Sequence, residues 1–471
     1  MSINFQLSQI ELERYKKYSG LNLPRHTSYP AVPFWKEYQG DETLDKLLSV
    51  IKEKERKISL YIHVPYCSSL CLYCGCTKEI YDQMRLSKHD PRKAYVDHLV
   101  KELKIYSKQV GDNVLAQIHF GGGTPTFLEP EQLKEIHQCI EDNFSISENV
   151  EYAVEIDPRV TSTEHLDTLK GMGVNRISLG IQDFDDKVQK AVNRVQPFEK
   201  VEDFVKECRS RNFSINFDLI YGLPFQTKES IDNTLKLVLN LDPDRIAFFR
   251  LALIPSMFKW QKSFSEKDLP SEDELLAINL FAINKLTDHA YSFIGLDHFA
   301  KNYDPLYSAW IKEGLRRNFQ GMTTGDKLNV IGVGPSAISQ LEGGYLQNSK
   351  DTKAWMEGLS EDRLPIIKEF ELQEDDHIRK EVIEALYTNG HIDKIMFKSR
   401  WGHDFDHYFS KCEKDLAKME EEGLIVNEAD SLFLTRVLGR LLVRAVASLF
   451  DRYYMETFSQ GKEAPSFSRL G

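Results

Sequence analysis

The sequence predicts an α/β fold built on parallel strands, and two observations lead to this expectation. Short segments rich in β-branched and aromatic residues recur along the chain and begin at Ser59, Ala116, Glu151, Arg176, Ser214 and Arg245. The segments between them have apolar residues at helical spacing, as at Val96, Leu99, Val100, Leu103 and Tyr106. Regular alternation of strand and helix implies right-handed crossovers, and therefore an open or closed β/α barrel or a doubly wound sheet.

Length and charge limit the classes of function. At 471 residues the chain is long enough for a large domain and at least one smaller one. A net charge of -12 argues against broad affinity for nucleic acid or anionic membrane. The N-terminus lacks the basic start and apolar stretch of a signal peptide, and we find no apolar run long enough to cross a membrane. We therefore expect a cytoplasmic protein with no nucleic-acid partner and no membrane insertion.

Unusual residues follow the expected strands. They are the cysteines of residues 67–76, the glycine-rich segment 121–125, Glu155 and Asp157, Gln182, and the segment 221–224. Because the carboxyl ends of parallel strands share one face, where sites are normally built, we expect these residues to line one pocket.

Four of the seven cysteines lie together after the first expected strand. Cys67, Cys71 and Cys74 form a C-x3-C-x2-C motif, and Cys76 follows two residues later. Zinc is the main alternative, but structural zinc sites usually take two ligand pairs separated by a longer stretch, so the spacing favours an iron-sulfur cluster. Three thiolates would leave one iron of a cubane cluster open to bind a substrate. The isolated cysteines Cys139, Cys208 and Cys412 are expected to be packing residues.

The C-x3-C-x2-C motif resembles the signature of radical S-adenosylmethionine (SAM) enzymes. Its surroundings resemble one family in particular, the oxygen-independent coproporphyrinogen III oxidases, also called coproporphyrinogen dehydrogenases or HemN. The segments that carry this resemblance are PRHTSYPAVPFW, HFGGGTPTFL, EIDPR, RISLGIQDF, FDLIYGLPFQT, GLDHFA, RRNFQGMTT and GRLLVRAVASLFDRYY. They occur in the same order and cover nearly the whole chain.

The resemblance implies a partial (β/α)6 radical SAM barrel with an N-terminal arm and a small, mostly helical C-terminal domain. The expected bounds are 1–55 for the arm that closes the pocket, 56–360 for the barrel and 361–471 for the C-terminal domain. The implied activity converts two propionates of coproporphyrinogen III into the vinyl groups of protoporphyrinogen IX, through a 5′-deoxyadenosyl radical. The implied cofactors are a [4Fe-4S] cluster and SAM, with two SAM molecules bound. A cellular electron donor, an electron acceptor and a monomeric state complete the expectation.

The same resemblance assigns site residues. Cys67, Cys71 and Cys74 would hold the cluster, and Cys76 would lie beside the cofactors as a catalytic residue without binding iron. The residues expected to contact the cluster or SAM are Tyr61, Tyr73, Gly122, Gly123, Thr124, Glu155, Gln182, Arg194, Asp218, Ala252, Gln320 and Ile338. Glycine would let backbone polar groups approach the methionine end, whereas a plain strand-to-helix turn is the alternative for the glycine segment.

The segment FRLALIP, residues 249–255, departs from the F-N-Y-A-H-[LV]-P pattern of the better-known members. Arg250 stands where asparagine is usual, and we expect it either to clamp a propionate carboxylate or to form a structural ion pair. Leu251 and Leu253 stand where the pattern has tyrosine and histidine. This loss of polar groups leaves a related tetrapyrrole as an alternative to coproporphyrinogen III as the substrate.

The chain changes character after about residue 360. Segments with helical spacing, including the one that begins at Ser431, predict a small helical domain, whose order also resembles a winged helix. Two other functions are open for a chain of this kind, a heme-trafficking protein and a radical SAM enzyme that degrades or methylates heme. Heme-trafficking relatives have an aromatic residue at the fourth cysteine, so Cys76 argues against the first of these.

Overall fold

The computed structural model describes residues 5–52, 57–325, 328–459 and 467. Six parallel strands lie side by side at its centre, and each corresponds to a segment expected from the sequence. They are β2 (Lys57–Val64), β5 (Val114–Gly122), β6 (Ser145–Ile156), β7 (Arg176–Gln182), β8 (Ser214–Tyr221) and β9 (Arg245–Arg250). The sheet ends in two unpaired edges, so the expected partial barrel is confirmed.

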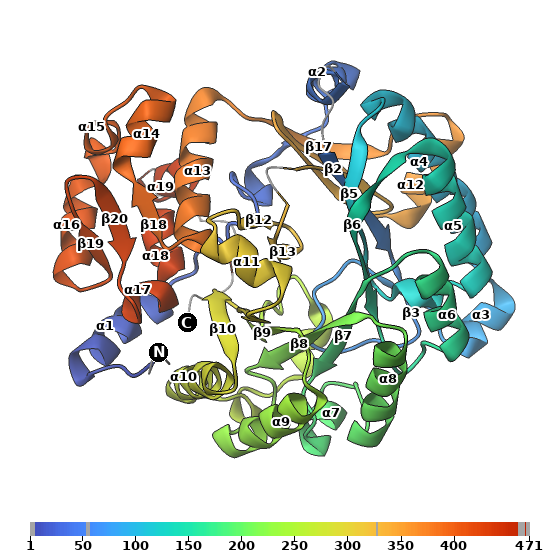
Figure 1. Ribbon diagram of the computed structural model, residues 1–471, viewed down its shortest axis with the longest axis horizontal. Coiled ribbons are helices and arrows are strands. Elements are labelled where there is room, and N and C mark those ends of the chain that lie inside the picture. The colour runs from blue at the N-terminus through green and yellow to red at the C-terminus, as the bar shows by residue number, and fades with distance from the viewer. Residues whose placement is uncertain (1–4, 53–56, 326–327, 460–466, 468–471) are drawn as a thin grey trace.

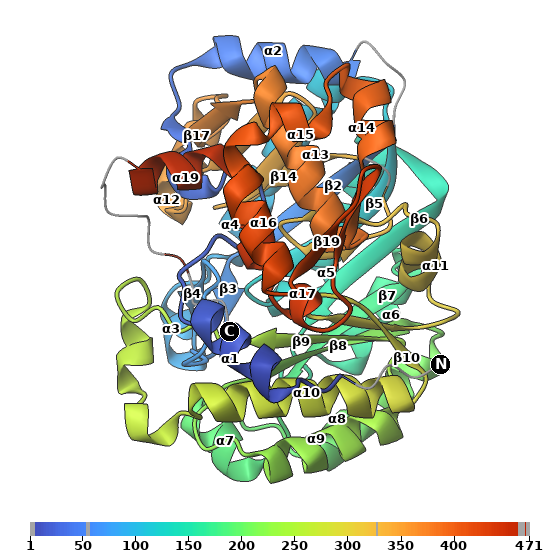
Figure 2. The ribbon, with the colours of Figure 1, turned by 90° about the vertical axis from the view of Figure 1, so that its left-hand side faces the viewer.

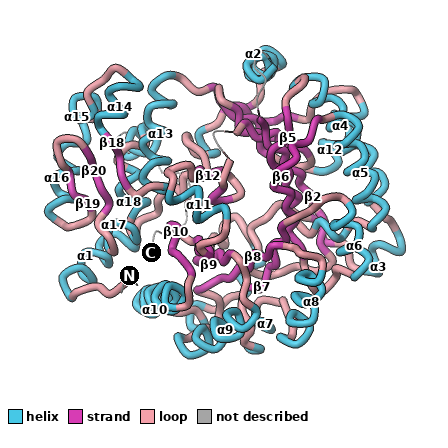
Figure 3. Tube along the Cα trace, viewed as in Figure 1, coloured by secondary structure: helices cyan, strands magenta, loops and turns pink. Residues whose placement is uncertain are grey.

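Helices cover the outer side of these strands (Figure 1). They are α4 (Arg92–Val110), α5 (Pro130–Asn143), α6 (Thr163–Gly171), α7 (Asp186–Ala191), α8 (Phe198–Ser210), α9 (Lys228–Leu241) and α10 (Glu272–Asp288). The apolar face expected for α4 is buried, with Val96, Leu99, Leu103 and Tyr106 completely inaccessible to solvent. Figure 3 shows the strands as a curved wall inside this outer layer of helices.

The central sheet is wider than the sequence predicts, with strands added at both edges. On one side β14 (Asn329–Val333) pairs in parallel with β2, and β15 (Ile338–Leu341), β16 (Gly344–Asn348), β17 (Ile366–Glu371) and β1 (Lys36–Glu37) follow. On the other side β11 (His298–Lys301) and β10 (Tyr291–Gly295) follow β9. Most of these strands have only four to six residues. Such short segments show too little periodicity to identify them from the sequence alone.

Two of the isolated cysteines are confirmed as packing residues. Cys139 and Cys208 belong to the main hydrophobic core between the sheet and its helices. Cys412 is half-buried against the core of the C-terminal domain.

Glu102 is a fully buried residue of α4 whose carboxylate forms hydrogen bonds to three other parts of the chain. It accepts hydrogen bonds from the Gly334 backbone N–H (2.8 Å), Asn348 Nδ2 (2.6 Å) and Trp355 Nε1 (3.0 Å). Burial raises the pKa of Glu102 from 4.5 to about 7, and these three donors offset only part of that effect.

This raised pKa predicts a pH dependence of stability. The folded state binds the Glu102 proton more tightly than the unfolded chain, so the contribution is complete below about pH 4.5 and is lost as the pH rises through about 7. We expect the thermal midpoint of the wild type to decrease as the pH is raised from about 5 to about 8. This decrease should exceed that of Glu102→Gln, whose side chain at position 102 carries no charge at any pH. Parallel curves for the two proteins in anaerobic thermal unfolding would show that the group does not titrate in this way.

The C-terminal domain contains a small sheet as well as helices. Its main helices are α13 (Glu374–Thr388), α14 (Lys394–Trp401), α16 (Glu413–Glu421), α17 (Leu438–Leu441), α18 (Val443–Ser448) and α19 (Arg452–Ser459). The helical prediction was wrong at Ser431–Leu434, which form β20 between β18 (His391–Asp393) and β19 (Ile425–Asn427). Pairing with two partners outweighs local helical spacing in a segment this short. The preceding strand β17 still belongs to the large sheet, beyond the expected domain boundary at residue 361.

The N-terminal arm joins the barrel to the C-terminal domain. Its first helix, α1 (Gln9–Ser19), lies beside α17 and α10 (Figure 2). Tyr15, Tyr18, Leu23 and Tyr29 of the arm share one hydrophobic core with the C-terminal domain. Farther along, β1 pairs with β17, and α2 (Asp41–Lys52) packs on the main core.

A buried histidine adds a polar contact to this docking. His26 lies 3.0 Å from Asp451 Oδ2 through Nε2 and 3.1 Å from the Tyr387 hydroxyl through Nδ1. Both partners belong to the C-terminal domain, so the arm is held there by hydrogen bonds as well as by apolar contacts. Among the residues described, no helix combines the length and the apolar character that crossing a membrane would need.

Candidate active site

The strands bring the predicted residues to one end of the barrel. In the parallel ladders Val64 lies beside Gly122, and Gly180 lies beside Asp218, each near the carboxyl end of its strand. Glu155 and Gln182 lie at the same end of β6 and β7. The cysteine loop follows β2 directly, so these motifs lie at the same end of the barrel. They do not all line one cavity, because Tyr221 of the segment 221–224 lines a different cavity from Glu155.

The glycine segment is part of the wall that supports the cysteine loop. The N–H groups of Gly123 and Thr124 donate to the carbonyls of Val64 (2.7 Å) and Tyr66 (2.8 Å), and β3 (Tyr66–Cys67) pairs with β4 (Glu79–Ile80) to close the loop. A Cβ at Gly123 would lie 2.6 Å from the Tyr66 carbonyl oxygen. Glycine is therefore required here for close contact within the chain, which is a reason that the sequence did not reveal.

Gly122 has a similar constraint. Its backbone φ of 106° lies in a region that residues with a side chain rarely adopt. An added Cβ would also lie 2.6 Å from the His63 ring. Its N–H points to Glu155 Oε2 at 3.3 Å. The Thr124 hydroxyl is directed at Cys67 Sγ, 3.6 Å away, and thus at an expected cluster ligand.

The thiols of the loop influence one another. Burial raises the pKa of Cys67 to about 11; the Thr124 hydroxyl opposes this rise, while neighbouring Cys74 and Cys71 add to it. The hydrogen bond from Cys76 is the largest cause that lowers the pKa of Cys74 to about 6, which favours a thiolate. Within the described ranges no three His, Cys, Asp or Glu side chains converge closely enough to hold a single metal ion. A cubane cluster instead needs one thiolate at each of three different irons, which spaced thiols on one loop can supply.

Two arginines lie beside Cys71. Arg194 Nη1 is 3.6 Å and Arg159 Nη2 is 3.7 Å from its sulfur, and both side chains also pair with Asp157. Arg194 further donates to the Gly180 carbonyl at 2.6 Å. The cations offset part of the negative charge that cluster thiolates would bring into this buried position.

A segment after β9 covers the cysteine loop. Trp260 Nε1 donates to the Cys74 carbonyl (3.0 Å), and Gln261 Nε2 donates to the Tyr73 carbonyl (3.1 Å). The Phe258 ring lies about 3.1 Å from the position that a Cβ on Gly75 would occupy. These contacts cover one side of the loop, whereas Gly75 and Cys76 remain exposed to solvent.

A cavity of about 150 Å³ extends into the barrel below this end. Glu155 and Asp218 line it, and Glu155 lies 3.0 Å from His119 Nε2. Burial acts to raise the pKa of Glu155, but His119 and the Gly122 N–H outweigh it and lower the pKa, so the group is a carboxylate at neutral pH. Burial and the charge of Glu155 raise the pKa of Asp218 to about 6. Such a pair can bind hydroxyl or ammonium groups of a ligand.

Of the two aromatic candidates, Tyr61 lies in β2 before the loop and Tyr73 lies within the loop. Tyr61 stacks on His119 and its hydroxyl lies 3.0 Å from His63 Nδ1, whereas Tyr73 packs in a small apolar cluster with Val188. Three later candidates are not brought together. Ala252 lines a different cavity, Gln320 lines the interior cavity, and Ile338 packs against the group formed by Trp35, Tyr345, Phe370 and Leu372.

Arg250 lies at the end of β9 as expected, and it has the predicted structural ion pair. Its Nη2 atom is 2.7 Å from Glu272 Oε1. Its Nη1 atom is buried and has no hydrogen-bond partner among the described residues. One half of the guanidinium is therefore occupied, and the other half remains to bind an acceptor.

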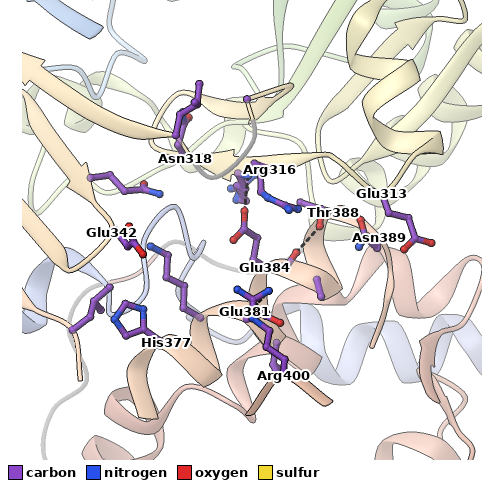
Figure 4. Close-up of a pocket in the computed structure, with 18 of the residues that line it drawn as sticks. Glu313, Arg316, Asn318, Glu342, His377, Glu381, Glu384, Thr388, Asn389 and Arg400 are labelled. Carbon is purple, nitrogen blue, oxygen red and sulfur yellow. Dashed lines mark hydrogen bonds and ion pairs between the residues drawn. The ribbon is translucent and has the colours of Figure 1, made fainter. Parts of the chain in front are cut away.

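A larger cavity lies away from this end of the barrel. It has a volume of about 1000 Å³ and lies between the β12–β13 hairpin (Arg316–Asn318 and Gly321–Thr323), the start of β14 and helix α13 (Figure 4). Both signs of charge line it, as Arg316, Arg400, Glu342 and Glu381 show. Gln117 and Thr323 line both this cavity and the interior one, so the two spaces adjoin.

Several site residues were not assigned from the sequence. Arg159 and His119 lie within the motifs EIDPR and HFGGGTPTFL, which could have identified them as candidates. The sequence does not identify Trp260 or Phe258 as candidates, because their role depends on how the segment after β9 runs across the cysteine loop.

Comparisons with known proteins agree with this geometry. The sequence model of the radical SAM superfamily matches residues 61–238, and that of the HemN C-terminal domain matches residues 372–442. Oxygen-independent coproporphyrinogen III oxidase from Helicobacter pylori strain J99 is 40% identical over 457 residues, 95% of this chain and 97% of that protein. The enzyme of the same name from Escherichia coli K12 is 37% identical over 460 residues, 98% of this chain and 97% of that protein.

The solved structure of coproporphyrinogen III oxidase (HemN) from Escherichia coli, described as a radical SAM enzyme, superposes with a TM-score of 0.88 at 34% identity. It covers 96% of this chain and 100% of that one. The fold and the three-cysteine loop thus define a radical SAM protein, a class that uses a [4Fe-4S] cluster and SAM. Within that class, the chain belongs to the family of oxygen-independent coproporphyrinogen III oxidases. The heme-trafficking and heme-degrading alternatives are not favoured.

Proposed function

We propose that this protein oxidatively decarboxylates two propionate side chains of coproporphyrinogen III and so forms protoporphyrinogen IX without oxygen. The observation that carries the proposal is the cysteine loop at the carboxyl end of the barrel, in a chain that matches coproporphyrinogen oxidases over almost its full length. For each vinyl group, one hydrogen leaves the β-carbon, the carboxylate leaves as carbon dioxide, and one electron passes to an acceptor.

The residues of the loop fit a cluster. Cys67, Cys71 and Cys74 would each hold one iron and leave the fourth open to SAM, and Cys76 would remain beside Cys74 without binding iron. When bound, the cluster and SAM supply the one-electron chemistry that removes a hydrogen atom from the substrate. The segment that covers one side of the loop would restrict water there, and the two arginines near Cys71 would balance the charge of the cluster thiolates.

For SAM, the interior cavity supports contacts from Glu155 and Asp218, with Gln182 at the neighbouring strand end. Tyr61, Tyr73, Thr124 and Arg194 would flank the cluster and SAM, and Gly122 and Gly123 shape the wall beside them. A second SAM molecule would take a contact from Gln320, which lines the same cavity as Glu155. Ala252 and Ile338 would then contact the cofactors from outside that cavity.

The remaining partners follow from this chemistry. A cellular electron donor would reduce the cluster, and an acceptor would take the electron left after decarboxylation. We place the reaction in the cytoplasm, since a reducing compartment preserves the free thiols of the loop, and we propose a monomer.

Arg250 would hold a propionate that does not react, through the half of its guanidinium that Glu272 leaves open. Arg250→Ala is expected to weaken productive binding of coproporphyrinogen III by about 1.5–3 kcal/mol, the scale of a charged hydrogen bond. Arg250→Lys should give an intermediate loss, because lysine keeps the charge but not the planar fork. The measurement is KM for the substrate, with substrate-free SAM cleavage as the control. Normal kinetics in Arg250→Ala would assign the residue a purely structural role.

An anaerobic assay tests the function itself. Reconstituted protein is supplied with SAM, a chemical reductant and either coproporphyrinogen III or heme, and the tetrapyrrole products are separated by chromatography. Protoporphyrinogen IX from the first mixture and unchanged heme in the second are expected. Modified heme with unchanged coproporphyrinogen would reverse the assignment.

A further inference from the structure

A small cavity at the carboxyl ends of β8 and β9 is lined by four arginines. Its volume is about 50 Å³, which suits a carboxylate group rather than a whole ligand. The arginines are Arg25, Arg250, Arg440 and Arg444, and Asp297 is the acidic residue that lines the cavity with them. They come from the arm, the barrel and the C-terminal domain, so the three parts of the chain meet here.

Two of these arginines present buried donors without acceptors. Arg250 uses Nη2 for Glu272, and Arg25 Nη2 lies 3.5 Å from Asp297 Oδ2. Arg250 Nη1 and Arg25 Nε are both buried, and neither has a hydrogen-bond partner in the part of the chain that the structure describes. Leaving such charged donors unpaired is unfavourable, so the arrangement fits an acceptor that the chain itself does not supply.

The other two arginines increase the positive charge around the same space. Burial lowers the pKa of Arg440 and of Arg444 to about 10. For Arg444 the nearby charges of Arg25 and Arg250 lower it further, while Asp297 opposes them. An anion in the cavity would relieve this crowding of cations.

The C-terminal domain positions Arg25. Arg444 donates hydrogen bonds to the carbonyl of Leu23 and, at 3.3 Å, to that of Pro24, the two residues that precede Arg25. Arg317 Nη2 lies 3.3 Å from the Arg25 carbonyl oxygen on the other side. The backbone that carries the Arg25 side chain is thereby fixed relative to the barrel and the C-terminal domain.

We propose that Arg25 and Arg250 together bind one carboxylate of the substrate, and that Arg444 is a positioning residue for Arg25. This inference rests on the proposed function, whose substrate carries four propionates. Ala252 lines the cavity, which therefore adjoins the proposed cofactor site, but the cavity shares no lining residue with the interior cavity that contains Glu155. We assign it to a propionate that is held beside the cofactors and does not react. Because the site is complete only when the arm is docked, substrate binding stabilises the closed arrangement of all three parts.

The test is anaerobic equilibrium dialysis of full-length reconstituted protein with coproporphyrinogen III, which is then oxidised to its fluorescent porphyrin for quantification. Arg25→Gln and Arg250→Gln should each raise the dissociation constant about tenfold, and Arg25→Lys should lie between Arg25→Gln and the wild type. Arg14→Gln is the matched control. Arg14 also lies in the arm and donates a hydrogen bond to the backbone carbonyl of Glu421 in the C-terminal domain, but it does not line the cavity. It should bind as the wild type does.

The double variant Arg25→Gln/Arg250→Gln shows whether the two residues share one carboxylate. If the two single losses of affinity were independent, their product would be about 100-fold. A shared carboxylate predicts a clearly smaller loss of affinity in the double variant, because the second change removes a contact that is already weakened. A fully multiplicative loss would place the two arginines on different groups and overturn the inference.

Cluster absorption and the thermal midpoint confirm that each variant is folded, and substrate-free SAM cleavage should be unchanged. Wild-type affinity in Arg25→Gln, with conversion of coproporphyrinogen III intact, would overturn the inference alone. A wild type that neither binds nor converts coproporphyrinogen III would overturn the proposed function together with it.

Discussion

Cys67→Ala, Cys71→Ala and Cys74→Ala are each expected to abolish the visible absorption of a reconstituted [4Fe-4S] cluster and, with it, SAM cleavage. Each thiolate would hold a different iron, so loss of any one of them would leave an iron without its protein ligand. Cys76→Ala should retain cluster iron, since that thiol, which is hydrogen-bonded to Cys74, is not one of the three proposed ligands. The measurement is iron and sulfide content, absorption and 5′-deoxyadenosine release after anaerobic reconstitution.

Cys139→Ala is the control for general loss of stability, because that cysteine lies in the core away from the site. Loss of the cluster in Cys76→Ala, as complete as in the other three variants, would show that the ligand set is wrong. Zinc in the anaerobically purified protein, with no iron or sulfide taken up on reconstitution, would contradict a cluster altogether.

Glu155→Ala is expected to weaken SAM binding by about 10- to 100-fold and to leave the cluster intact. The carboxylate is held ionised by His119 and by the Gly122 N–H, at the mouth of the interior cavity, where it can accept a charged hydrogen bond. Glu155→Gln should lose less, because the amide keeps one acceptor.

Glu148→Ala provides the matched control, since Glu148 is exposed near the other end of the same strand β6. Anaerobic titration with SAM decides the outcome, and unchanged affinity in both Glu155 variants would remove this residue from the SAM site. Gly123→Ala is unsuitable for the purpose: its Cβ would displace the Tyr66 carbonyl next to Cys67 and disturb the cluster loop itself.

The position of the site was predictable because its signals are local. The cysteine loop follows a strand with clear β character, and Gly122, Glu155 and Gln182 lie at or near the ends of three others. The parallel order then places all the carboxyl ends on one face. Cys67 and Glu155 needed no knowledge of distant contacts to be placed together. The same reasoning correctly limited the lone Cys139 and Cys208 to the core.

Residues whose role depends on long-range docking were not predictable. Arg25 lies beside Arg250 only because Arg444 and Arg317 hold the backbone of the arm. The covering role of Trp260 depends on the path of an irregular loop, and β20 forms because two partner strands are present. The glycine at position 123 was correctly singled out but for an incomplete reason, since contacts within the chain already require it.

The most direct test of the account follows a hydrogen atom. Coproporphyrinogen III with deuterium at the propionate β-carbons is incubated anaerobically with reconstituted protein, SAM and reductant, and the products are analysed by mass spectrometry. The account predicts protoporphyrinogen IX that lacks two carboxylates and 5′-deoxyadenosine that contains deuterium, with neither formed by Cys71→Ala. Deuterium-free 5′-deoxyadenosine with unchanged coproporphyrinogen III, from protein with an intact cluster, would contradict it.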